Sequence, residues 1–64
     1  MMRNKLGMHY HRRDDTVEIT TPRKQEKLFF HGCRSAAHTQ YGIQITPTIG
    51  AKYTVDEWGI RHWN

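Results

Sequence analysis

Short segments in which apolar and polar residues alternate recur along this 64-residue chain, and this period of two is typical of β-strands. The clearest segment is residues 16–21, TVEITT, whose β-branched residues favour a strand. Pro22 ends it because proline has no N–H to donate to a sheet ladder. A charged loop leads to residues 27–31, KLFFH, as a second strand. We therefore predict a hairpin with one covered face, in which only one of Phe29 and Phe30 is buried.

Two further parts of the chain carry the same alternation. Residues 43–46, IQIT, and residues 51–55, AKYTV, flank a PTIG turn and predict a second hairpin. Residues 1–13 have mixed character: they would form either a strand with His9 and His11 on one face or a flexible basic arm.

A short central helix is predicted between the two hairpins. Ser35 is a suitable N-cap, residues 36–41 would form about two turns, and Gly42 would serve as the left-handed residue that ends the helix. So short a helix would depend on packing rather than on its own propensity.

The C-terminal segment fits two structures. Thr54 and Glu57 have the spacing of a capping box, which favours a helix over residues 55–63. Gly59 opposes this, since glycine costs a helix interior about 1 kcal/mol relative to alanine, and the alternation beginning at Trp58 would suit a last strand. We favour the helix.

These elements together predict one small domain, residues 1–64, of the α+β class and rich in β-structure. The two hairpins would form a small antiparallel sheet or a partly closed barrel of about four or five strands, with the central helix and the C-terminal helix beside it. The exposed edges of such a sheet would accept a partner strand, including one from a second copy in a homodimer.

Composition indicates that this domain has little core to stabilise it. The mean hydropathy is −0.88, and a domain of this size usually needs a disulfide, a metal or a partner. A single cysteine excludes an intrachain disulfide, and no apolar run has the length of a signal peptide or a membrane span. We expect a cytoplasmic protein without a membrane association.

The net charge of +4 lies entirely in the first half of the chain. Residues 1–34 contain eight Lys and Arg against four Asp and Glu, whereas residues 35–64 contain two of each. Segregated positive charge attracts phosphates, and interleaved aromatic side chains can stack on unpaired bases. The predicted nucleic-acid-binding residues are Arg12, Arg13, Arg23, Lys24, Lys27 and Arg34, with the interleaved aromatic residues Tyr10, Phe29, Phe30 and Tyr41.

A zinc site is a further hypothesis. His9 and His11 form one pair of ligands and His31 and Cys33 another, and four nitrogen or sulfur ligands suit a closed structural zinc site. The alternative is that the histidines lie on the surface and add to its positive charge at mildly acidic pH. Cys33 would then be a small hydrophobic side chain, because nothing around it resembles an activated nucleophile.

The aromatic second half suggests a protein partner instead. Tyr53, Trp58, Arg61 and Trp63 are of the residue types that dominate protein interfaces. The ending from Thr54 to Trp63-Asn64 is similar to that of small phage zinc-ribbon proteins of the restriction-alleviation type, although the chain lacks the paired-cysteine knuckles of that family.

No catalytic arrangement is evident in the sequence. Asp14 and Asp15 would point to opposite faces of a strand, and there is no glycine-rich phosphate loop. We therefore expect a non-enzymatic regulatory module that binds nucleic acid or a nucleoprotein complex. The alternatives are a small phage or mobile-element protein that inhibits or adapts a host protein machine, and a zinc-stapled ribbon.

Overall fold

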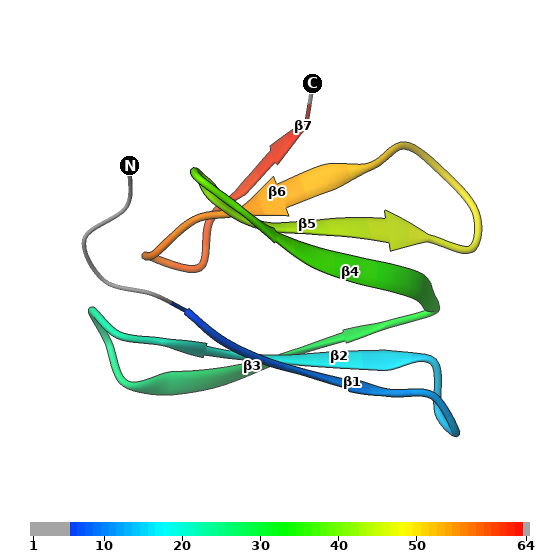
Figure 1. Ribbon diagram of the computed structural model, residues 1–64, viewed down its shortest axis with the longest axis horizontal. Coiled ribbons are helices and arrows are strands. Elements are labelled where there is room, and N and C mark those ends of the chain that lie inside the picture. The colour runs from blue at the N-terminus through cyan, green and yellow to red at the C-terminus, as the bar shows by residue number, and fades with distance from the viewer. Residues whose placement is uncertain (1–5, 64) are drawn as a thin grey trace.

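The protein folds into two antiparallel β-sheets that lie one over the other (Figure 1). The computed structural model describes residues 6–63, and these residues contain seven strands and no helix. The N-terminal sheet has the order β1-β2-β3 and the C-terminal sheet the order β4-β5-β6-β7. The strands are β1 (Gly7–His11), β2 (Thr16–Thr21), β3 (Glu26–His31), β4 (Cys33–Thr39), β5 (Gly42–Pro47), β6 (Tyr53–Val55) and β7 (Arg61–Trp63).

The first predicted hairpin is confirmed. β2 has the predicted bounds, and β3 begins one residue earlier than predicted, at Glu26. Val17 pairs with Phe30 across this hairpin, and Phe30 is 5% exposed whereas Phe29 is 54% exposed. Alternation therefore buries one phenylalanine and leaves the other on the surface, as expected.

The predicted second hairpin is also confirmed, and part of the N-terminal segment is a strand. β5 and β6 pair antiparallel, with Ile45 opposite Tyr53. β1 pairs antiparallel with the free side of β2, and it places His9 and His11 on one face. Residues 1–5 of the predicted basic arm lie outside the described residues.

The predicted central helix is wrong, because β4 occupies its place. A helix of two turns lacks the length to stabilise itself, whereas an extended chain pairs with β5 continuously from Ser35 to Thr39 and, beyond a shift in register, at Cys33. Ala36 lies opposite Ile45 and His38 opposite Ile43 in this pairing. Gly42 does not end a helix: it begins β5 after a tight turn.

The predicted C-terminal helix is wrong as well. One Asp56 carboxylate oxygen accepts hydrogen bonds of 2.9 Å from the backbone N–H groups of Trp58 and Ile60, which closes a turn rather than a first helical turn. Gly59 completes the turn with φ of +83°, a conformation that glycine adopts without strain. The imidazole of His62 on β7 contacts the Asp56 carboxylate, with 2.7 Å between Nε2 and Oδ2.

The core lies between the two sheets, so the α+β expectation of one sheet with helices is replaced by an all-β sandwich. Residues at alternate positions on both inner faces are buried, and the crossing between the sheets adds Cys33. Burial of each aliphatic side chain contributes about 1.5–3 kcal/mol. The core consists of Leu6, Val17, Ile19, Phe30, Cys33, Ile43, Ile45, Tyr53 and Val55.

No helix in the part of the chain that the structure describes has the length and apolarity that crossing a membrane requires.

Gly42 is the position where we expect the fold to be least tolerant of a side chain. Its φ is +148°, and a Cβ atom there would clash with the Val55 carbonyl oxygen and lie 3.2 Å from the Asp56 Cα atom. Gly42→Ala is expected to lower the free energy of unfolding by at least about 2 kcal/mol, measured by urea denaturation.

Gly50→Ala is the matched control for this variant. Gly50 also has a positive φ, +109°, but a Cβ atom there would meet nothing within 4 Å. Equal denaturation midpoints for the two variants would contradict the proposed clash between Gly42 and β6.

Candidate nucleic-acid interface

The alternation that buries one face of the N-terminal sheet leaves a polar and aromatic face on the other side. Two cross-strand rows make up this face. Glu18 lies between His9 and Phe29 in one row, and Thr16 lies between His11 and His31 in the other. We call this surface the outer face; its residues are His9, His11, Thr16, Glu18, Lys27, Phe29 and His31.

Three flat rings dominate one part of the outer face. The imidazoles of His9 and His11 stack on each other, with 4.3 Å between ring centroids and 28° between their planes. Phe29, two strands away on β3, has an exposed benzyl ring. These rings stand on β1 and β3, the two edge strands of a three-stranded sheet, so their positions are set by the sheet rather than by a loop.

Glu18 is the carboxylate at the centre of the outer face, and two basic groups contact it. Its Oε1 atom lies 3.1 Å from His11 Nε2, and its Oε2 atom lies 3.7 Å from Lys27 Nζ. The hydrogen bond from His11 lowers the pKa of Glu18; partial burial opposes this, and Lys27 lowers the pKa further. The negative charge of Glu18 is therefore offset locally by the Lys27 ammonium and by the hydrogen bond with His11.

A shallow hollow lies beside these rings. It has a volume of about 420 Å³ and is lined by His11, Asp14, Thr16, Glu18, Phe29 and His31. The Thr16 hydroxyl donates to the Asp14 carbonyl at 3.0 Å, and His31 Nδ1 lies 3.0 Å from the same hydroxyl oxygen. Because the single hydroxyl proton is used, His31 Nδ1 is the donor to Thr16. In the neutral imidazole of His31, Nε2 then carries no proton and can accept a hydrogen bond.

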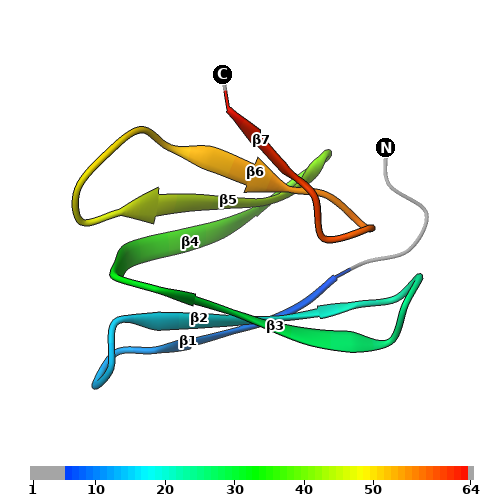
Figure 2. The same cartoon turned by 180° about the vertical axis from the view of Figure 1, so that it is seen from behind.

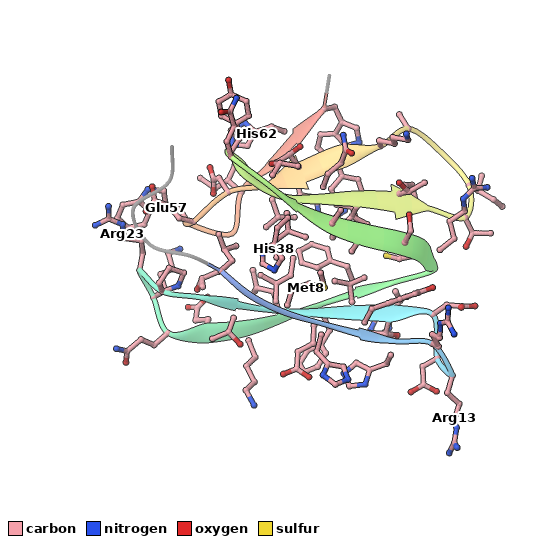
Figure 3. The ribbon with its side chains drawn as sticks, in the orientation of Figure 1. Met8, Arg13, Arg23, His38, Glu57 and His62 are labelled. Carbon is pink, nitrogen blue, oxygen red and sulfur yellow. The ribbon has the colours of Figure 1, made fainter. Side chains whose placement is uncertain are left out.

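The predicted basic residues do not form one cluster. Arg12 and Arg13 lie in the turn between β1 and β2, whereas Arg23 and Lys24 lie in the turn between β2 and β3, at the opposite end of the N-terminal sheet. Figure 3 shows Arg13 and Arg23 at the two ends of the molecule. Arg34 is the second residue of β4, and it follows Cys33, whose N–H donates to the Asp15 carbonyl oxygen in the first of these turns.

Arg23 connects the two sheets. Its side chain lies beside that of Glu57 (Figure 3), and its Nε atom donates to Glu57 Oε2 at 2.7 Å. Its guanidinium carbon lies 5.1 Å from the centre of the Trp58 ring. The turn of the first hairpin is thus attached to the turn before β7. Part of the positive charge of Arg23 is neutralised by this contact.

The side chain of Cys33 lies in the core, on the other side of the N-terminal sheet from the three histidines of the predicted zinc site, His9, His11 and His31. Cys33 is completely buried, and its thiol donates to the Phe30 carbonyl oxygen at 3.2 Å. His9 and His11 lie on the outer face instead. Residues 6–63 contain no group of three or more His, Cys, Asp or Glu placed to hold a metal ion.

The predicted protein-binding residues have different environments. Tyr53 is 6% exposed and belongs to the core. Arg61 lies over the rings of Phe30 and Tyr53, and Trp58 and Trp63 are about half exposed. These residues belong to the C-terminal sheet, on β6, β7 and the turn between them, whereas the outer face belongs to the N-terminal sheet.

The sequence alone does not assemble the outer face. It predicts His9, His11 and His31 as metal ligands, and it places Phe29 among several aromatic residues interleaved with cations. The alternation within β1 and β3 was visible, but the common face of His9, Glu18 and Phe29 depends on the register of two strand pairs.

Comparison of the chain with protein-family models, with curated proteins and with solved structures finds no match.

The contact between His11 and Glu18 can be tested by titration. In His11→Ala, the pKa of Glu18 should rise towards its ordinary value, because the main interaction that lowers it is lost. NMR titration of the side-chain carboxyl carbon measures this. Since the folded-state pKa is lowered, the stabilisation from Glu18 is present above the unfolded-state pKa and is lost as the pH falls through the folded-state value.

His38→Ala is the control for this titration, because His38 lies on β4 in the other sheet. An unchanged pKa of Glu18 in His11→Ala would show that His11 does not hold this carboxylate.

Burial raises the pKa of the Cys33 thiol, and we expect it to be unreactive in the native protein. Alkylation by iodoacetamide at neutral pH should be at least about tenfold slower in buffer than in urea. The double variant Cys33→Ser and Arg34→Cys is the control, since residue 34 is exposed and its thiol should react in buffer. Equal rates for wild-type protein in both solvents would contradict the buried position.

Proposed function

We propose that the outer face binds single-stranded nucleic acid, and that the protein is a non-enzymatic regulatory module acting in the cytoplasm. One observation carries the proposal: an exposed phenylalanine and a stacked pair of histidines stand on a single sheet face. Bases of any sequence can stack on such rings, and each stacked base contributes about 1–3 kcal/mol.

The charges around the rings support the same ligand. Lys27 lies on the outer face, and Arg12 and Arg13 project from the turn at the end of β1. Glu18, the acidic group among the rings, is contacted by His11 and Lys27. A strand that runs along the outer face could place its bases on the rings and its phosphates near these cations.

Single strands are favoured over duplexes for a geometric reason. The rings can stack only on bases whose faces are free, and the bases of a duplex are already stacked on each other. The outer face is also a sheet surface rather than a projecting helix or ribbon that would enter a major groove.

Phe29→Ala tests the stacking. Its ring is 54% exposed, so its removal should preserve the fold while weakening binding to labelled single-stranded DNA or RNA by about fivefold to a hundredfold. Fluorescence anisotropy at about 50 mM salt measures the affinity. Tyr41→Ala is the matched control: Tyr41 is 71% exposed but lies in the turn between β4 and β5.

The same assay over about 50–200 mM salt tests the phosphate contacts. Arg12→Ala should reduce the magnitude of the slope of log K against log salt concentration by about one. Lys52→Ala, in the segment between β5 and β6 of the C-terminal sheet, should leave this slope unchanged. Absence of binding at the lowest salt, or equal losses in Phe29→Ala and Tyr41→Ala, would refute the proposed interface.

A further inference from the structure

The free edge of β7 has an unusual set of side chains. β7 is the last strand in the order of the C-terminal sheet, so only its β6 side is paired among residues 6–63 (Figure 2). Ile60, just before β7, and Trp63, the last residue of β7, have side chains that are 56% and 59% exposed. Large apolar side chains beside an unpaired strand edge are typical of a surface that another chain covers.

The register of β7 determines which backbone groups face this free edge. The Asp56 N–H donates to the Ile60 carbonyl oxygen, so these opposite residues form a hydrogen-bonded pair. Such pairs alternate along an antiparallel ladder, and the next one is Thr54 with His62. The N–H and C=O groups of Arg61 and Trp63 therefore point away from β6, towards the free edge.

Arg61 supplies a positive charge at the same edge. Its guanidinium carbon lies 4.8 Å from the centre of the Phe30 ring and 5.0 Å from that of Tyr53. In the described part of the chain, no carboxylate forms an ion pair with Arg61, whereas Arg23 is paired with Glu57. Arg61 is thus held in place by aromatic rings while its charge remains available.

Arg61 and Trp63 lie on the same face of β7, because they are two residues apart. His62 lies on the opposite face, where it is paired with Asp56. A strand added to β7 would therefore meet a cation and an indole on one side at alternate positions. The matching sequence has a carboxylate and an apolar side chain separated by one residue.

We propose that the free edge of β7 binds an extended acidic segment of a partner protein, which adds an antiparallel strand to the C-terminal sheet. Backbone hydrogen bonds would form with Arg61 and Trp63, a carboxylate would pair with the Arg61 guanidinium, and an apolar side chain would cover the Trp63 ring. The charge of Arg61, which no carboxylate pairs in the described part of the chain, favours an acidic segment. The net charge of +4 on each molecule, although it is carried by the first half of the chain, opposes the approach of two copies. This surface is separate from the outer face and does not depend on nucleic-acid binding.

A designed peptide provides the test. The probe is a short fluorescent peptide in which glutamate and leucine are separated by one threonine, and the control peptide of the same composition places glutamate and leucine next to each other. We expect the alternating peptide to bind at least about tenfold more tightly, because adjacent residues of a strand point to opposite faces. NMR amide shifts should change at β7 and not on β1 or β3.

A charge exchange tests the role of Arg61. Arg61→Glu should lose binding to the acidic peptide and gain binding to a peptide with lysine in place of glutamate, while Phe29→Ala should bind the acidic peptide like the wild-type protein. Thermal unfolding checks that Arg61→Glu is folded. Trp63→Ala, which keeps the Arg61 contacts with Phe30 and Tyr53, is the second variant and should also weaken binding.

Three outcomes would overturn the proposal. The first is no binding of the alternating peptide at about millimolar concentration, where a specific contact worth about 4 kcal/mol would be detected. The second is a set of amide shifts on the outer face, which would identify the peptide as a general polyanion. The third is a dimer in sedimentation that Trp63→Ala dissociates, which would make a second copy of the chain the occupant of this edge.

Discussion

The passage of the chain from one sheet to the other, at Gly32 and Cys33, is the constraint on which the rest of the structure depends. Three hydrogen bonds from separate segments hold it. The Cys33 N–H donates to the Asp15 carbonyl, the Thr48 N–H donates to the Gly32 carbonyl, and the Tyr10 hydroxyl donates to the Cys33 carbonyl. Two turns and a strand are thus attached to two adjacent residues. The inner faces of the two sheets face each other as a consequence.

The role of the single cysteine follows from this position. The thiol of Cys33 is buried where the two sheets meet, and it donates to the Phe30 carbonyl at 3.2 Å. A small side chain with a weak donor fits such a site, whereas a metal ligand or a nucleophile would need access to solvent or to other ligands. The core therefore uses Cys33 for packing, while His31, two residues before it, lies on the outer face of the N-terminal sheet.

The two proposed surfaces have different physical origins. The outer face exists because strands in a two-layer structure bury only one side, so the opposite side of β1, β2 and β3 is available for rings and charges. The edge of β7 exists because the C-terminal sheet does not close on itself. Arg61 connects the core to this edge. Its side chain packs on the buried rings of Phe30 and Tyr53, and its backbone N–H and C=O groups face the open edge.

The sequence by itself determined the strands whose alternation is strong, since the period of two is a local property. The strand over residues 16–21 follows from it, and so does the burial of only one of Phe29 and Phe30. The register that places Phe30 opposite Val17 decided which of the two is buried. The two helix predictions were wrong because the patterns behind them, an N-cap residue and a capping box, are also local, and the same residue types occur in turns and strands. Asp56 binds N–H groups in a turn as readily as at a helix start, and Ala36 fits a strand once Ile45 lies opposite.

Only the tertiary structure decided which faces meet. Register, sheet partition and the common surface of His9, Glu18 and Phe29 depend on hydrogen bonds between residues far apart in the chain, which no local pattern encodes.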